Sequence, residues 1–217
     1  MPSLPSYDKR TAVIGSTGSG KTQFAVWLLS NRDFDVRPWI IFDYKGDALI
    51  EAIKPEIVSI HSEPPTKPGI YAVRPIPDLD DKAVEAFLWK IWANGETGIY
   101  VDEGYMLGPR NPALNACLTQ GRSKHIEMIV LSQRPLWLSR FVFSEANYFA
   151  IFNLTDLDDR KTVKRFIGGR SISTLPKYNC LWYDVDKQEP CQFAPVPGRN
   201  EIIGIFQKRL EKRVKTI

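Results

Sequence analysis

Eight consecutive residues near the amino terminus match the pattern G-x-x-x-x-G-K-[ST] of a nucleotide phosphate-binding loop. In such a loop, glycines let the backbone N–H groups turn toward phosphate oxygens, the lysine reaches the β- and γ-phosphates, and the threonine hydroxyl ligates Mg²⁺. The match predicts that the chain binds a nucleoside triphosphate together with Mg²⁺. The eight residues are Gly15, Ser16, Thr17, Gly18, Ser19, Gly20, Lys21 and Thr22.

The residues on either side of this loop have the patterns that a phosphate site requires. The apolar run from Ala12 to Ile14 precedes the loop and predicts a strand. Phe24, Trp27 and Leu28 follow with the i, i+3, i+4 spacing of an amphipathic helix. A helix that begins near Lys21 would point its positive dipole end at the phosphates. The alternative, a flexible turn with a chance lysine, does not account for both flanks.

Two adjacent carboxylates end a second apolar run. Gly98 to Val101 predicts a strand, and Asp102 and Glu103 follow it directly. This is the pattern of a Walker B strand, in which the first carboxylate helps to hold Mg²⁺ and the second polarises the attacking water. Asp102 and Glu103 therefore predict hydrolysis rather than binding alone. The alternative is a strand whose acidic end caps a turn.

A polar amide follows a third apolar run. Met128 to Leu131 predicts a strand, and Gln133 comes two residues later, before a turn fixed by Pro135. Since the carboxyl ends of parallel strands meet at one edge of a sheet, Gln133 would hydrogen-bond the γ-phosphate or the attacking water. Alternatively, it is a polar residue that merely ends a strand.

Apolar β-rich runs alternate with helical or loop stretches along the chain. This alternation predicts an α/β fold with a mostly parallel central sheet flanked by helices. Val84 to Trp92 has the spacing of an amphipathic helix after the acidic segment 78–81, and three prolines make segment 61–69 an irregular connection. Toward the carboxyl terminus we expect an antiparallel hairpin, formed by 178–184 and 192–194, and then a helix from Glu201. The apolar β-rich runs are 11–14, 39–42, 57–60, 70–73, 99–101, 128–131 and 148–152.

Five segments together resemble the FtsK–HerA superfamily of DNA-pumping ATPases. Within it they are most similar to the small genome-packaging ATPases of internal-membrane, double-jelly-roll DNA viruses. The similarity covers roughly residues 10–155. Many families share the phosphate-binding loop, whereas a strand followed by Asp-x-Lys-Gly, together with Gly-Arg ahead of Ser-Gln-Arg-Pro, is much more specific. The segments are Gly15 to Thr22, Ile41 to Gly46, Val101 to Glu103, Gly121-Arg122 and Leu131 to Pro135.

The resemblance implies a RecA-like P-loop NTPase core of the ASCE type that assembles into a homo-oligomeric ring, a hexamer or a pentamer. Such a ring hydrolyses ATP between neighbouring subunits, threads double-stranded DNA through its centre, and docks on a capsid vertex or portal component. By position, Arg122 is the candidate arginine finger for the neighbour's γ-phosphate, and Arg134 is the rival. Such fingers are worth roughly 10³ to 10⁵ in rate. A surface arginine without this role is the alternative.

The length of 217 residues fits one domain, with a nucleotide-binding core over 10–155 and a C-terminal elaboration over 156–217. Since about ten residues precede the first predicted strand, we expect neither a winged-helix module nor an N-terminal barrel, and the minimal packaging motor is favoured. An FtsK- or HerA-like pump in another role, a small-molecule kinase and a nucleotide-gated structural protein remain alternatives. A GTPase is disfavoured because no N-K-x-D or T-K-x-D sequence occurs.

The amino-acid composition bears on the ligands, the metal and disulfide sites and the location of the protein. A net charge of +4 and a pI near 8.9 permit polyanion binding without requiring it. Three cysteines without a C-x-x-C pair and two distant histidines support neither a disulfide framework nor a zinc site. No apolar run approaches the 18 residues of a membrane span, and no signal core begins the chain. We therefore expect a soluble, non-secreted protein without stable membrane insertion. The resemblance to viral packaging ATPases implies that it is found in the host cytoplasm or on the virion.

Two basic clusters are candidates for contacts with DNA phosphates, although either could be a solvated face. In the second cluster, apolar residues from Ile202 to Val214 recur every four positions and would place the basic residues on the opposite side of a helix. Trp137, Tyr178 and Trp182 could also contact DNA, with packing inside the protein as the alternative. The clusters are Arg160, Lys161, Lys164, Arg165 and Arg170, and Lys208, Arg209, Lys212, Arg213 and Lys215.

Overall fold

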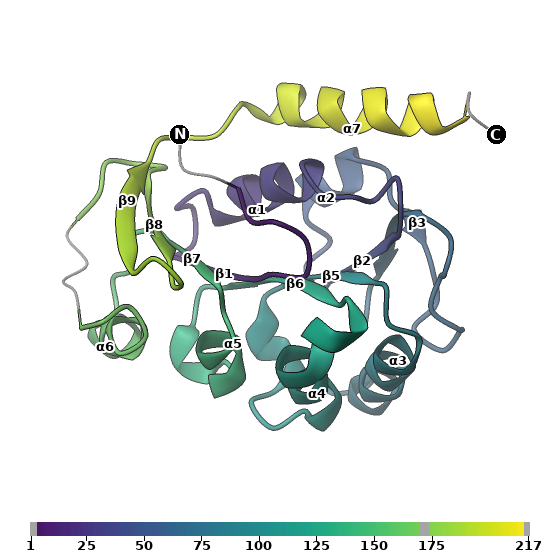
Figure 1. Cartoon of the computed structure of the whole chain (residues 1–217), viewed down its shortest axis with the longest axis horizontal. Coiled ribbons are helices and arrows are strands. Elements are labelled where there is room, and N and C mark those ends of the chain that lie inside the picture. The colour runs from purple at the N-terminus through teal and green to yellow at the C-terminus, as the bar shows by residue number, and fades with distance from the viewer. Residues whose placement is uncertain (1–3, 170–173, 215–217) are drawn as a thin grey trace.

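The residues that the structure describes form a nine-stranded sheet with helices on both faces (Figure 1). The structure is a computed structural model that describes residues 4–169 and 174–214, with side chains up to 211. The strand order is β3-β4-β2-β5-β6-β1-β7-β8-β9, and all neighbours pair in parallel except β7 with β8 and β8 with β9. The strands are β1 (Arg10–Ile14), β2 (Pro38–Asp43), β3 (Glu56–Ile57), β4 (Gly69–Val73), β5 (Gly98–Asp102), β6 (Glu127–Ser132), β7 (Tyr148–Ile151), β8 (Cys180–Asp184) and β9 (Glu189–Phe193).

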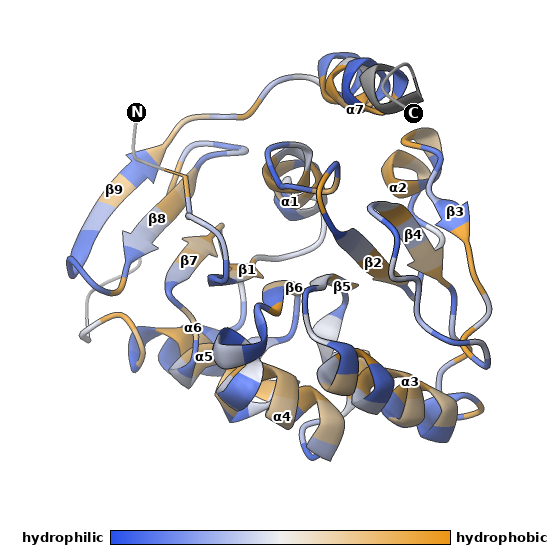
Figure 2. Ribbon diagram, turned by 45° about the vertical axis from the view of Figure 1, so that its right-hand side comes forward, coloured by the Kyte–Doolittle hydropathy of each residue, from blue (hydrophilic) through white to orange (hydrophobic). Residues whose placement is uncertain are grey.

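Two layers of helices bury the parallel strands. α1, α2 and α7 lie on one face of the sheet, and α3 to α6 lie on the other (Figure 1). Every residue of β1, β2, β4, β5, β6 and β7 is buried, as expected for a parallel sheet covered on both faces. Figure 2 shows that β4 and β7 are mainly hydrophobic. The helices are α1 (Lys21–Ser30), α2 (Ala48–Ala52), α3 (Asp81–Asn94), α4 (Pro112–Gln120), α5 (Arg140–Ser144), α6 (Leu157–Lys164) and α7 (Arg199–Val214), with 3-10 helices η1 (Gly104–Leu107), η2 (Gly121–Lys124) and η3 (Pro135–Trp137).

The α/β fold with a mostly parallel sheet confirms the prediction from the apolar runs. Six of the seven predicted strands occur with each end within one residue of its predicted position, and α3 occupies the predicted amphipathic segment. The predicted strand over 57–60 is wrong in its extent, because only Glu56 and Ile57 pair with β4. β3 lies at the edge of the sheet and is short because the chain turns soon after it: Ser62 N donates to Ser59 O at 3.1 Å, and Ile60 enters the core from this turn.

The predicted hairpin extends the central sheet. β8 pairs with β7 and β9 pairs with β8, both antiparallel, around a turn at 185–188. The strands begin at Cys180 and Glu189, which corrects the predicted bounds. Trp182 is 2% exposed and stacks on Tyr148 with ring centroids 5.2 Å apart. Trp182 is therefore a core residue and is not available to DNA.

The helix α7 covers α1. Ile202 and Phe206 are fully buried, and the Phe206 ring stacks on Phe34 at 5.3 Å. The amphipathic helix predicted after the phosphate-binding loop is consequently buried on most of its surface, because α1 lies between the sheet and α7. The sequence pattern of α1 alone did not indicate this second covering layer.

One residue of the terminal basic cluster is engaged inside the protein. The Arg209 guanidinium lies 4.0 Å over the Phe34 ring and pairs with Asp35. This position corrects the expectation that the basic residues of α7 all project away from its apolar side. The side chains of Lys212 and Arg213, and all of Arg170 and Lys215, lie outside the described residues. No helix in the described part of the chain is long and apolar enough to span a bilayer.

The first residue of β5 must be small. A Cβ at Gly98 would lie 2.1 Å from atoms of the fully buried Trp39 ring. Gly98→Ala should therefore lower the free energy of unfolding by about 1–3 kcal/mol, because a packed ring has little room to move. Urea denaturation measures this change. In the control Gly204→Ala, the new Cβ meets nothing within 4 Å in α7, and stability should rise by up to about 1 kcal/mol. Wild-type stability of Gly98→Ala would contradict the close contact with Trp39.

Candidate nucleotide-binding and hydrolysis site

The phosphate-binding loop lies between the carboxyl ends of three neighbouring strands. It connects β1 to α1, and its first two residues are hydrogen-bonded to β6 and to the segment just after β7: Gly15 N donates to Ser132 O at 3.1 Å, and Ser16 N donates to Asn153 O at 3.0 Å. Gly20 has a φ of 100° and lies directly before α1, in a conformation that favours glycine. The predicted strand, loop and helix are therefore all present, and residues 15–22 form one continuous loop and helix start.

Lys21 is buried at the first position of α1, where it is 5% exposed. Burial lowers the pKa of Lys21 from its usual value, and the negative charge of Glu103 opposes that shift. A nearby anion therefore stabilises the charged form of this ammonium. A nucleotide phosphate bound on the loop would add negative charge to that of Glu103.

Asp102 is a buried carboxylate without a hydrogen-bond partner. It ends β5, is 1% exposed, and neither of its side-chain oxygens accepts a hydrogen bond from the described residues. Burial, and then the neighbouring charge of Glu103, raise the pKa of Asp102 to about 7. Because buried polar atoms are normally satisfied, an orphaned carboxylate at this position fits a cation.

The donor set around Asp102 suits Mg²⁺. No group of three His, Cys, Asp or Glu side chains with metal-binding geometry occurs among the described residues. A cation here would therefore take most of its ligands from water and phosphate oxygens, as Mg²⁺ commonly does. Thr22, in the first turn of α1, and Asp102 are the two side chains proposed to hold the ion.

Glu103 is fully buried and lies beside two ammonium groups. It has a left-handed φ of 57° directly after β5. The ammonium of Lys45 contacts its Oε1, and Lys21 Nζ lies 3.9 Å from the same oxygen. The Gln133 backbone N–H donates to its Oε2 at 3.4 Å. Segments that follow β1, β2, β5 and β6 thus meet at this one carboxylate.

Lys45 is a site residue that the sequence motifs did not single out. It lies in the segment Ile41 to Gly46, without an assigned role. The available signal was its place two residues after Asp43, which ends β2 and pairs in register with Asp102. Because β2 and β5 are neighbours, a side chain that follows one can reach a side chain that follows the other.

Gln133 lies over the phosphate-binding loop, as its sequence position predicts. Its side-chain oxygen accepts a hydrogen bond from the Thr17 hydroxyl, and its Nε2 donates to the Tyr105 hydroxyl at 3.4 Å. The structure therefore brings Lys21, Asp102, Glu103 and Gln133 into one place. An amide between the loop and Glu103 is suited to detect a bound phosphate.

Arg122 lies near the amino-terminal ends of the parallel strands, opposite the ends that carry the phosphate-binding loop. It belongs to η2, which precedes β6, whereas the phosphate-binding loop follows β1, the parallel neighbour of β6. Arg10, at the start of β1, interacts electrostatically with Arg122. With the described residues, the Arg122 guanidinium makes no hydrogen bond or ion pair. Arg122 therefore cannot serve the phosphate-binding loop of its own chain.

A network of ion pairs anchors the segment that carries Arg122. His125 follows η2 directly, and its Nδ1 lies 2.8 Å from Asp8. The Arg37 guanidinium donates to the His125 carbonyl at 2.6 Å and pairs with the buried Glu127 at 2.8 Å. The backbone around Arg122 is thus fixed while its own side chain stays exposed.

Arg134 is adjacent to Gln133 but is engaged within its own chain. Its guanidinium lies 3.6 Å from the Asp159 carboxylate and 4.6 Å over the Trp137 ring. In the nearby basic cluster, Lys161 pairs with Asp158 at 3.0 Å, and Arg160 donates to the Leu154 carbonyl. Parts of this cluster therefore bind the protein itself, while Trp137 and Tyr178 remain 51% and 48% exposed.

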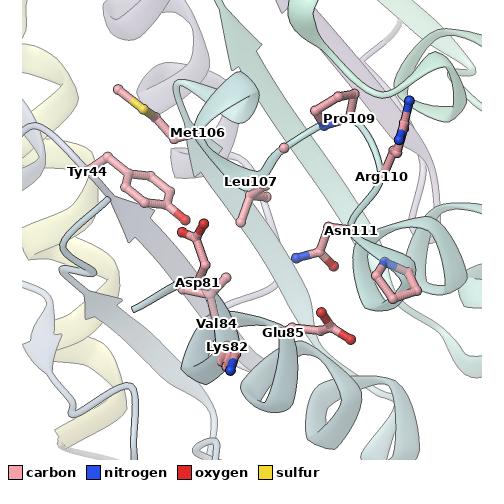
Figure 3. Close-up of a pocket in the computed structure, with 12 residues that line it drawn as sticks. Tyr44, Asp81, Lys82, Val84, Glu85, Met106, Leu107, Pro109, Arg110 and Asn111 are labelled. Atoms are coloured by element: carbon pink, nitrogen blue, oxygen red, sulfur yellow. The ribbon is translucent and has the colours of Figure 1, made fainter. Parts of the chain in front are cut away.

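A cavity of about 520 Å³ lies beside the site (Figure 3). Tyr44 from the segment after β2, Asp81 at the start of α3, and Met106 and Leu107 from η1 contribute to its wall. No residue of the phosphate-binding loop lines this cavity. It is thus separate from the nucleotide position, although it borders the segments that carry Lys45 and Glu103.

Comparison with known proteins identifies a close relative over nearly the whole chain. The DNA packaging ATPase P9 of Enterobacteria phage PRD1 is 43% identical over 224 residues, which cover 99% of this chain and 98% of P9. No family model matches the chain.

Solved structures show the same fold at low identity. The genome packaging NTPase B204 of Sulfolobus turreted icosahedral virus 2, in complex with sulfate, has a TM-score of 0.69 at 18% identity, covering 89% of this chain and 99% of B204. VirB4 of Thermoanaerobacter pseudethanolicus has a TM-score of 0.66 at 10% identity, covering 89% of this chain and 90% of VirB4.

The unpartnered Asp102 predicts an unusual pH dependence of stability. Its pKa is higher in the folded than in the unfolded protein, so the folded state keeps a proton that the unfolded chain releases. Stability should therefore fall between about pH 4 and pH 7, by about 1.4 kcal/mol for each unit by which the pKa is raised. Asp102→Asn removes this cost. In thermal unfolding without nucleotide or Mg²⁺, the variant's advantage over wild type should be largest at pH 8 and vanish toward pH 4. An advantage that does not change with pH would contradict the assignment.

Proposed function

The chain belongs to the family of viral DNA packaging ATPases that includes P9 of phage PRD1, and from this premise we propose that it is an ATP-hydrolysing motor that translocates double-stranded DNA into a preformed capsid. One observation carries the proposal: a phosphate-binding loop, an orphaned carboxylate at Asp102 and a second carboxylate at Glu103 meet at one edge of a parallel sheet. The resemblance to DNA-pumping ATPases agrees with the family relationship.

Each side chain has a distinct role in the proposed reaction. The backbone of residues 15–20 and the Lys21 ammonium bind the phosphates, and the start of α1 adds its positive dipole end. Thr22 and Asp102 would hold Mg²⁺, which neutralises phosphate charge when it is bound. Glu103 accepts a hydrogen bond from the attacking water, and Gln133 contacts the γ-phosphate or that water.

The proposed site is completed by a neighbouring subunit. Because Arg122 lies at the sheet edge opposite its own phosphate-binding loop, it can act on phosphate only in another copy of the chain. A ring of subunits, hexameric or pentameric, gives every loop such a neighbour. We favour Arg122 over Arg134 as the finger, because Arg134 is held by Asp159 and Trp137.

The remaining partners and the location follow from the same proposal. A motor that moves any sequence should hold DNA through phosphates, for which the exposed lysines and arginines of the two basic clusters are available. The ring would dock on a capsid vertex or portal component. We propose that the protein is located in the host cytoplasm or on the virion. We further propose that residues 1–217 act as one domain, since β8, β9 and α7 are continuous with the core formed by residues 10–155.

The central test is ATP hydrolysis measured with and without duplex DNA over a range of protein concentrations. We expect the rate per subunit to rise with concentration, as rings form, and to rise again with DNA. Glu103→Gln should lower kcat by at least about 10²-fold while ATP still binds, because water activation is lost. Tight ATP binding by wild type without turnover, with or without DNA, would instead select a nucleotide-gated structural protein.

Mixed rings test the arginine finger. Arg122→Ala should reduce kcat in homogeneous rings by about 10³-fold or more, because charge on the transferred phosphate is no longer neutralised. Doping these rings with the Glu103→Gln variant should restore turnover, since that subunit offers an intact Arg122 to a neighbour with an intact Glu103. Arg134→Ala provides the matched comparison. Full activity of Arg122→Ala, or no rescue on mixing, would contradict action between subunits.

A further inference from the structure

We propose that Lys45 is a positioning residue that restrains Glu103 and so suppresses ATP hydrolysis until the motor is engaged on DNA. This inference rests on the proposed function, because it assumes that Glu103 activates water. The observation behind it is the contact of the Lys45 ammonium with Glu103 Oε1, the same oxygen that lies 3.9 Å from Lys21 Nζ.

The contacts of Glu103 leave little of its carboxylate for water. One oxygen faces two ammonium groups, the other accepts from the Gln133 backbone N–H, and the side chain is fully buried. To polarise a water, this carboxylate must accept a hydrogen bond from it. A carboxylate already paired with two cations is a poor acceptor, so this arrangement is a resting one.

The two lysines are not equivalent. Lys21 belongs to the phosphate-binding loop, so the triphosphate draws it away from Glu103 when ATP binds. Lys45 is outside that loop, and its side chain is 42% exposed while that of Lys21 is only 6% exposed. Bound ATP therefore removes one restraint and leaves the other. When Lys45 withdraws, its ammonium returns to water, and the hydrogen bond that Glu103 then accepts from the attacking water offsets part of the cost of unpairing the buried carboxylate.

The local backbone allows this movement. Lys45 lies between β2 and α2, next to Gly46, whose φ is 64°. Its neighbour Tyr44 lines the same cavity as Met106 and Leu107, which follow Glu103 closely (Figure 3). The segments that carry the two partners thus border open space, and they can separate without disturbing the sheet.

The test compares Lys45→Ala with wild type in steady-state ATP hydrolysis, without DNA and with saturating duplex DNA. Without DNA, the variant should have a kcat about tenfold higher at unchanged KM, because one charged hydrogen bond to Glu103 is lost. With DNA, both proteins should reach the same kcat, so the stimulation ratio falls about tenfold. A merely structural role for Lys45 would not raise kcat.

Two further variants control the experiment. Lys45→Arg keeps the positive charge and should keep the low DNA-free rate, whereas Lys67→Ala removes an exposed lysine elsewhere and should match wild type. A DNA-free kcat of Lys45→Ala equal to or below that of wild type overturns the proposal, as does a raised DNA-free rate in Lys45→Arg. If DNA fails to stimulate wild type, the translocase function fails, while the DNA-free comparison still decides the role of Lys45.

Discussion

Two adjacent carboxylates, Asp102 and Glu103, are buried at the carboxyl end of β5, and the organisation of the site follows from the cost of burying them. An unpaired charge in a protein interior is costly, so it is neutralised or paired. The structure pairs Glu103 with Lys21 and Lys45 and leaves Asp102 unpaired with a raised pKa. These two outcomes suit different tasks, since a restrained carboxylate can be released and an orphaned one can take a cation.

The carboxyl and amino ends of the parallel strands carry different groups of the proposed site. The carboxyl edge gathers Lys21, Asp102, Glu103 and Gln133, because the segments after neighbouring parallel strands necessarily converge there. The amino edge carries Arg122 on a segment held by His125, Arg37 and the buried Glu127. A chain that places complementary groups on opposite edges is suited to work between copies of itself. This separation is the physical basis of the proposed ring.

The sequence predicted most of the fold because its patterns are local. Buried parallel strands appear as short apolar runs, and the glycines of the phosphate-binding loop have a conformational requirement that other residues meet poorly. The errors concern contacts between distant segments. The covering of α1 by α7, the pairing of Arg209 with Asp35 and the shortness of β3 depend on which surfaces meet after folding.

The sequence by itself determined the chemical groups of the site, since residues 15–22, Asp102, Glu103 and Gln133 follow strands that periodicity identifies. Only the tertiary structure decided how these groups are connected. In the folded chain the Lys45 ammonium contacts Glu103, and Asp102 has no hydrogen-bond partner among the described residues. Arg122 lies too far from the phosphate-binding loop of its own chain to contact it. The physical reason is that the order of strands in the sheet, β2 beside β5 and β6 beside β1, differs from their order in the chain and is fixed only when the layers pack.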